Sequence, residues 1–190
     1  MADIRIGFAM TGSFCTFKAV MPQMKRLVEA GYRVTPIMSE NAYSTDTRFG
    51  KARDFVFQAE EITGEKVIHT IAQAEPIGPK KLLDLLILAP CTGNTLGKLA
   101  AGIYDTAPTL AFKSHRRNDG PVLIAVSTND ALAGAAAGIG SLMNRKGVYF
   151  VPFEQDDFSG KPTSCVADFT RIGEAAEAAL CGRQLQPLLV

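Results

Sequence analysis

Short apolar runs alternate with longer stretches of mixed polarity along almost the whole chain. The apolar runs predict strands at residues 4–10, 32–38, 66–71, 84–89, 121–127 and 147–153. In the stretches between them apolar residues recur at helical spacing, which predicts helices at 15–30, 50–62, 96–103, 107–115, 132–143 and 166–180. Because strands alternate with helices, we expect a three-layer α/β fold: one domain, residues 1–190, built on a doubly wound parallel sheet.

The run at 84–89 and the residues after it carry the strongest local signal. An uninterrupted apolar run is typical of a strand buried on both faces of a parallel sheet, and Pro90 is expected to stop it because proline cannot donate to a ladder. Small and polar residues up to Thr95 then lead into a helix. The first N–H groups of a helix lack partners within it, so the turn predicts a receptor for an anionic or polar ligand. Simple capping by Thr92 or Asn94 is the alternative, and the position at the carboxyl end of a strand favours the ligand.

The turn after the first predicted strand, Thr11-Gly12-Ser13, offers a second polar cluster. The dinucleotide fingerprint needs three glycines spaced G-x-G-x-x-G, and only Gly7 and Gly12 are available here. Gly7 lies inside the strand, so the fingerprint is absent. Two hydroxyls and one glycine suit the binding of a single phosphate instead. Glu40, which follows the second strand, leaves open an alternative in which an acidic side chain binds the ribose of NAD.

His69 and Asn129 are candidates for groups that act on a substrate. His69 lies in the predicted strand at 66–71, where a lone histidine is usually structural. Near a strand end it could exchange a proton, because imidazoles titrate close to neutral pH. Asn129 lies in a polar run at the carboxyl end of the strand at 121–127. The loop at 74–81, which contains two prolines and a glycine, is long enough to fold over such a site.

Composition excludes several classes of function. The formal net charge of +1 gives no reason to expect a nucleic-acid partner, and no apolar run approaches the roughly 20 residues of a membrane span. We therefore expect a soluble cytoplasmic protein with neither nucleic-acid nor membrane partners. The cysteines form no CxxC pair, so no metal site or disulfide framework is expected. Cys15 and Cys91 follow predicted strands, where a nucleophile is conceivable, although buried inert thiols are commoner.

The motifs at these strand ends resemble the flavoprotein family that includes phosphopantothenoylcysteine decarboxylase, lantibiotic cysteine decarboxylases and flavin prenyltransferases. The resemblance covers roughly residues 4–138 and rests on three motifs. They are Thr11-Gly12-Ser13, Ser39 and the pattern A-P-x-T-x-N-T-x-x-K-x-x-x-G-I-x-D at 89–105. The resemblance implies a Rossmann-like flavoprotein fold and an FMN site built from these loops. The FMN contacts of the family carry over to Gly12, Ser13, Ser39, Thr92, Asn94 and Thr95.

One branch of this family, the B chains of two-chain enzymes from spore-forming bacteria, is similar over nearly the whole chain. The matching segments include GFAMTGSFCTFKAVMP, VSTNDALAG and VYFVPFEQDD. This likeness implies an oxidoreductase subunit that works during sporulation with an A chain on a small dihydropyridine dicarboxylate. It places His69 and Asn129 on the substrate side. It also implies a homo-oligomer, to which the Ala- and Gly-rich segment at 132–143 is suited.

Departures from the decarboxylases of the family bear on the reaction. Their motif P-x-M-N-x-x-M corresponds here to residues 127–132, which keep only the asparagine, and the segment between His69 and Pro90 is longer. Decarboxylation of a cysteine peptide is therefore disfavoured. A flavin-dependent decarboxylase or prenyltransferase, and a non-catalytic partner of the A chain, are the alternatives to an oxidoreductase subunit.

Overall fold

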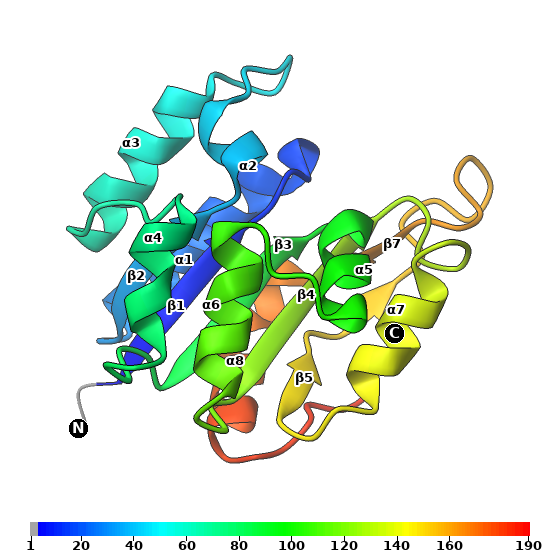
Figure 1. Cartoon of the computed structure of the whole chain (residues 1–190). Coiled ribbons are helices and arrows are strands. Elements are labelled where there is room, and N and C mark those ends of the chain that lie inside the picture. The colour runs from blue at the N-terminus through cyan, green and yellow to red at the C-terminus, as the bar shows by residue number, and fades with distance from the viewer. Residues whose placement is uncertain (1–3) are drawn as a thin grey trace.

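A twisted sheet runs through the middle of the molecule, and the computed structural model describes it within residues 4–190 (Figure 1). Its seven strands in this range are β1 (Arg5–Met10), β2 (Arg33–Met38), β3 (Leu85–Cys91), β4 (Val122–Thr128), β5 (Val148–Phe150), β6 (Phe153–Glu154) and β7 (Cys165–Ala167). The order is β2-β1-β3-β4-β7-β6, and β5 also pairs with β4. The pairs among β1 to β5 are parallel, which confirms the predicted α/β sheet. Two short antiparallel strands, β6 and β7, extend it.

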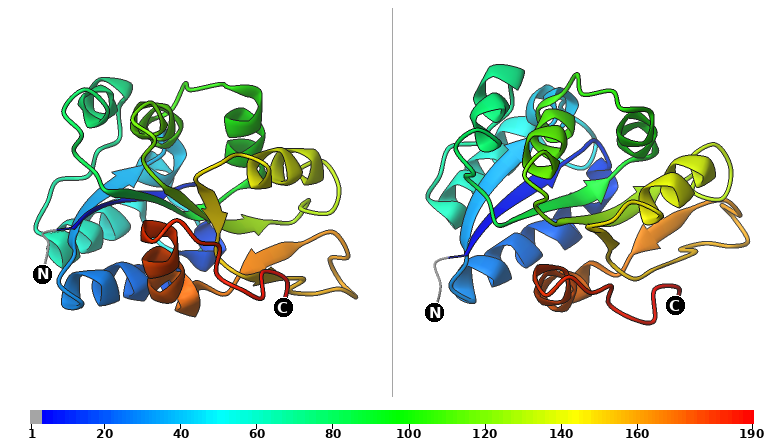
Figure 2. Two further views of the ribbon diagram at one scale, coloured as in Figure 1. Left: turned by 90° about the horizontal axis from the view of Figure 1, so that it is seen from below. Right: turned by 60° about the horizontal axis from the view of Figure 1, so that its bottom comes forward.

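Helices cover both faces of the sheet (Figure 2). They are α1 (Phe17–Glu29), α2 (Glu40–Ser44), α3 (Ala52–Thr63), α4 (Ile71–Ala74), α5 (Gly93–Ala101), α6 (Ala107–Arg116), α7 (Ala136–Met143) and α8 (Ile172–Leu180), with 3-10 turns η1 (Phe14–Thr16), η2 (Glu75–Ile77) and η3 (Phe169–Arg171). α1, α3 and α8 pack on one face, and α4, α5, α6 and α7 on the other. Within residues 4–190 none of these helices combines the length and the apolar character needed to cross a bilayer.

The helix boundaries follow from local capping chemistry. Thr106 begins α6 with a capping box, in which its hydroxyl accepts from the N–H of Thr109 and the Thr109 hydroxyl accepts in return from the N–H of Thr106. Gly102 ends α5 in the left-handed region, at φ 74°, where a residue without Cβ is unstrained. The centre of the sheet lies in the core. All seven residues of β3 are buried, as expected for a strand that is covered on both faces.

The strand predicted at 66–71 does not form, and the predicted end of the strand at 84–89 is wrong. In the segment predicted as a strand at 66–71, only Ile68 makes a β-bridge, to Ile37, because Thr70 and Gln73 form a capping box that starts α4. The second error concerns Pro90, which does not stop β3: the strand continues to Cys91. The register against β4 shifts between Leu88 and Cys91, an irregularity that accommodates the missing N–H donor.

The end of the chain also departs from the predicted pattern. The apolar run at 147–153 is divided between β5 and β6, and residues 165–167 form β7 where the helix at 166–180 was expected to begin. That helix, α8, starts only at Ile172 because β7 is drawn into antiparallel pairing with the end of β4, at Ser127 and Thr128. Similarly, α7 starts at Ala136 rather than at 132. α1 starts at Phe17 and continues through Pro22.

The loop at 74–81 does not fold over a site. It contains η2 and packs against α6. Just beyond the end of α6, the Asn118 Nδ2 group donates a hydrogen bond of 2.7 Å to the Gly78 carbonyl. A Cβ at Gly78 would lie 2.5 Å from the backbone oxygen of Ser114. The absent side chain therefore allows the loop to press against the helix backbone.

Gly78→Ala is expected to destabilise the protein by about 2–3 kcal/mol, because the new methyl group meets backbone that cannot rotate away. The matched control is Gly140→Ala in α7, where a Cβ would meet no heavy atom within 4 Å. Removing a helical glycine there should leave stability unchanged or raise it by up to about 1 kcal/mol. Urea unfolding of both variants measures the difference, and equal midpoints would contradict the close packing at Gly78.

Candidate functional site

Two adjoining cavities open at the carboxyl ends of β1, β2, β3 and β4. The larger encloses about 620 Å³ and the smaller about 370 Å³, both within the range of small-molecule sites. Gly12, Thr92 and Asn94 line both, so the two cavities are neighbours. The larger is also lined by Ser13, Phe14, Cys15, Thr16, Phe49, Gly93, Ser127, Thr128, Asn129, Asp130, Asp156, Lys161, Ser164, Cys165 and Val166. The smaller is also lined by Thr11, Ser39, Glu40, Asn41, Thr95, Lys98, Asp105 and Thr106.

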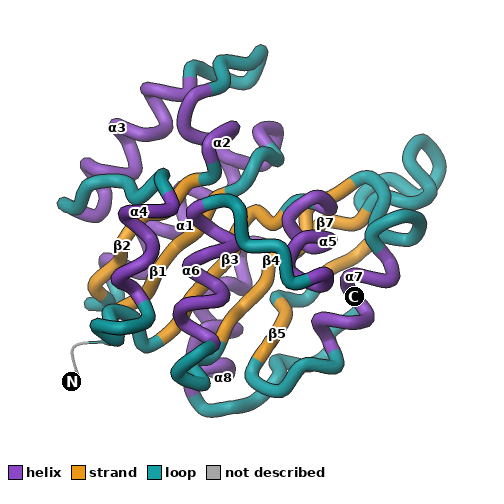
Figure 3. Tube along the Cα trace, viewed as in Figure 1, coloured by secondary structure: helices purple, strands orange, loops and turns teal. Residues whose placement is uncertain are grey.

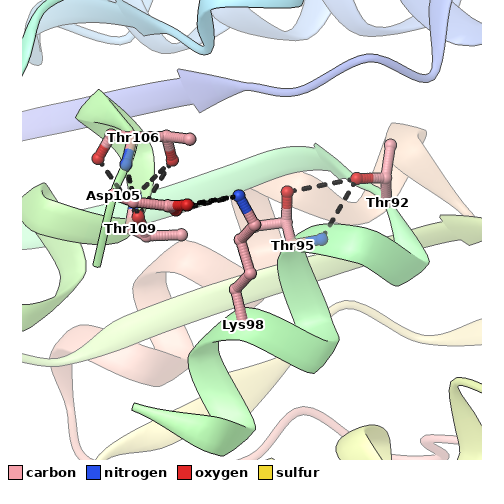
Figure 4. Close-up of polar contacts among 6 residues, drawn as sticks. All are labelled: Thr92, Thr95, Lys98, Asp105, Thr106 and Thr109. Atoms are coloured by element: carbon pink, nitrogen blue, oxygen red, sulfur yellow. Dashed lines mark hydrogen bonds and ion pairs between the residues drawn. The ribbon is translucent and has the colours of Figure 1, made fainter. Parts of the chain in front are cut away.

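Thr92 joins the turns after β1 and β3. Its backbone N–H donates to the Thr11 hydroxyl oxygen over 3.0 Å, and that hydroxyl donates to the Pro90 carbonyl over 2.8 Å. The Thr92 side chain caps α5: its oxygen accepts from the N–H of Thr95 and lies 3.1 Å from the Thr95 hydroxyl (Figure 4). The next residue is Gly93, and α5 thus opens directly onto both cavities. The unpaired N–H groups of a first helical turn favour negative charge there.

Residues after β1 and β2 complete the rim of the site. The Ser13 hydroxyl lies 2.8 Å from the Ser127 hydroxyl at the end of β4, which ties the first turn to the far side of the larger cavity. Ser39 caps the short helix α2, because its side-chain oxygen accepts from the N–H of Ala42. Its own N–H donates to the carbonyl of Met10 over 3.0 Å. These bonds hold both serines in position against the cavities.

Lys98 and Asp105 form an ion pair at the smaller cavity. The Lys98 ammonium reaches across from α5 and lies 2.8 and 2.9 Å from the two Asp105 carboxylate oxygens (Figure 4). The hydrogen bond and the positive charge of Lys98 hold the pKa of Asp105 below its usual value. Asp105 thus stays ionised and is neutralised by its partner.

Of the two residues predicted to act on a substrate, Asn129 lines a cavity and His69 does not. Asn129, exposed, lines the larger cavity, and its carbonyl accepts a 2.7 Å hydrogen bond from the Thr163 hydroxyl. His69 lines neither cavity of its own chain. Its ring stacks on Tyr43, with centroids 3.7 Å apart and the planes inclined by 7°, and its backbone N–H donates to the Gln73 side chain. By contrast, the predicted cofactor residues Gly12, Ser13, Ser39, Thr92, Asn94 and Thr95 all line one or both cavities.

Sequence reasoning missed the wall that the segment between β6 and β7 supplies. Asp156, Lys161 and Ser164 line the larger cavity, whereas the polar residues at 155–164 by themselves predict only a loop. These residues lie at the cavity because β7 pairs with β4, and no local sequence pattern predicts that pairing. The loop projects from the end of the sheet in Figure 3.

Two of the cysteines near the site, Cys91 and Cys165, are poor nucleophiles because they are buried. Cys91 is fully buried in β3, and this burial raises the pKa of its thiol. Cys165 lines the larger cavity, and its thiol pKa is also raised, first by burial and then by the negative charge of Asp156. A thiol held protonated attacks weakly. Cys15 is exposed at the rim, 3.9 Å from the Ser13 hydroxyl.

The chain belongs to the Flavoprotein family, whose model matches residues 1–148. It is 45% identical over 186 residues to the B subunit of dipicolinate synthase of Bacillus subtilis (strain 168), a match that covers 98% of this chain and 93% of the relative. The crystal structure of the B subunit of dipicolinate synthase from Bacillus halodurans C is similar with a TM-score of 0.91 and 42% identity, covering 100% of this chain and 98% of that one.

More distant solved structures share the fold alone. The FMN-dependent cysteine decarboxylase SpaF is similar with a TM-score of 0.70 and 20% identity, covering 95% of this chain and 98% of that one. The expected flavoprotein fold is therefore confirmed, and membership of the family supports a flavin-linked role.

Proposed function

We propose that this chain is the FMN-binding B subunit of a dipicolinate synthase, an oxidoreductase that forms dipicolinate from dihydrodipicolinate in the cytoplasm of sporulating cells. One observation carries the proposal: the six residues expected to contact FMN come from three separate strand ends and meet in one pair of adjoining cavities. The similarity to the B subunit of dipicolinate synthase over nearly the whole length of both chains supports the choice of reaction.

The chemistry of the two cavities fits FMN. The smaller presents the hydroxyls of Ser39, Thr92 and Thr95 beside the opening turn of α5, a set of donors suited to a phosphate and a polyol. The ion pair of Lys98 neutralises Asp105 there. The larger has more apolar walls, with Phe14 and Phe49, and its size suits a flat ring together with a small substrate.

Bound FMN would supply a hydride acceptor, and the protein would orient the substrate and handle protons. Asn129 is the amide at the larger cavity that would hold a substrate carboxylate. His69 would remove the proton that leaves with the hydride. Since His69 lines neither cavity of its own chain, it would act at a site completed by a second copy, and we therefore propose a homo-oligomer. An A chain, implied by the naming of the relatives as one subunit of a synthase, would be the other partner.

Protein purified without added cofactor should show the absorbance bands of an oxidised flavin, with one FMN released per chain on denaturation. With the A chain and dihydrodipicolinate it should form dipicolinate, and without the A chain the rate should fall. If the protein carries no flavin but dipicolinate formation by the A chain still depends on it, the protein is a non-catalytic partner. If the protein releases CO₂ from a cysteine peptide and forms no dipicolinate, it is a decarboxylase.

A further inference from the structure

The loop at 155–164 is anchored to the site rather than free. The Thr163 hydroxyl donates to the Asn129 carbonyl over 2.7 Å, and the N–H of Leu132 donates to the Thr163 carbonyl over 3.0 Å. Within the loop, the N–H of Lys161 donates to the Asp157 carbonyl over 2.7 Å, and the Lys161 carbonyl accepts from Ser164 over 2.9 Å. The backbone of Lys161 is therefore fixed relative to the strand end that carries Asn129.

Lys161 is the single lysine or arginine among the described residues that line the larger cavity. Two carboxylates, those of Asp130 and Asp156, also line this cavity, and they have different partners. Asp130 accepts a hydrogen bond from the Thr128 hydroxyl and faces Gly93 at the start of α5. A carboxylate oxygen of Asp156 lies 3.6 Å from the Lys161 ammonium nitrogen, and the Lys161 side chain is 57% exposed. A loose, solvent-exposed ion pair of this kind contributes little stability, so an incoming anion can replace Asp156.

We propose that Lys161 binds a carboxylate of the substrate and selects dicarboxylates over monocarboxylates. The proposal rests on the proposed function, because it takes a pyridine dicarboxylate as the ligand. Asn129 offers only a neutral amide, and a second carboxylate entering the larger cavity needs a cation. An ammonium held above the cavity by an anchored loop can supply a charge-assisted hydrogen bond once the ligand displaces water.

The test measures binding to FMN-loaded protein by calorimetry, with pyridine-2,6-dicarboxylate and pyridine-2-carboxylate as probes. Lys161→Gln should weaken binding of the dicarboxylate about 10-fold, the effect of one hydrogen bond to a charged group. Binding of the monocarboxylate should change much less. Lys161→Arg should retain the preference. Lys146→Gln removes the same charge at the amino end of β5, outside both cavities, and should bind both acids as the parent does.

Two failures can be told apart. If the parent binds both acids and Lys161→Gln keeps the parental preference, the role of Lys161 is overturned while the proposed function stands. If the FMN-loaded parent binds neither acid, the proposed function falls and takes this inference with it. FMN content and melting temperature of each variant show that a lost preference does not come from lost fold or lost cofactor.

Discussion

Ser39→Asp is expected to lower the affinity for FMN about 100-fold while leaving the fold intact. Aspartate caps a helix as well as serine does, so α2 keeps its cap when the hydroxyl oxygen is replaced by a carboxylate oxygen. The new negative charge would stand in the smaller cavity, where the phosphate is proposed to bind. Two like charges about 4 Å apart repel by roughly 4 kcal/mol at an effective dielectric constant near 20, and solvent screening reduces this to the expected effect.

Ser39→Asn is the matched control, because asparagine also caps the helix but adds no charge. Riboflavin, which lacks the phosphate, is the second control and should bind the Asp and Asn variants equally. Titration of flavin fluorescence measures all four affinities. Equal FMN affinities of the two variants would place the phosphate elsewhere, and a matching loss of riboflavin binding would indicate damage to the site as a whole.

The parts of the site that could be predicted share one physical origin. In a parallel sheet the carboxyl ends of neighbouring strands meet at one edge, so polar turns after separate apolar runs converge without any further information. This argument predicts that Thr92 and Ser39 lie near each other, and both line the smaller cavity. Both also cap the helices that follow them, and capping does not exclude a place at the cavity wall.

The parts that escaped prediction depend on long-range pairing or on competing local signals. β7 has three residues, too few for a periodic pattern, and it pairs with β4 across more than 35 positions of sequence. That pairing, together with the hydrogen bonds of Thr163 to Asn129 and Leu132, brings Lys161 to the site. The sequence itself contains the reason why the strand predicted around His69 does not form. Thr70 and Gln73 have the spacing of a capping box, which starts a helix where apolar neighbours predicted a strand.

His69→Ala and Asn129→Ala are each expected to lose most dipicolinate formation when assayed with the A chain. Loss of a positioned general base typically lowers a rate about 10²–10⁴-fold, which is the expectation for His69→Ala per FMN-loaded chain. Asn129→Ala should act mainly by weakening substrate binding, with FMN content retained. Tyr43→Phe keeps an aromatic ring stacked on His69 and should retain activity.

The decisive measurement mixes the two inactive variants. If His69 of one copy serves the cavity of another, a mixed oligomer contains some sites with both an intact His69 and an intact Asn129. Random exchange of equal amounts should then restore about one quarter of the parental activity, because half of the cavities keep Asn129 and half of their neighbouring copies keep His69. If both residues acted within one chain, every site would lack one of them and mixing would restore nothing. His69→Ala with full activity but a lower melting temperature would instead show that the imidazole only supports Tyr43.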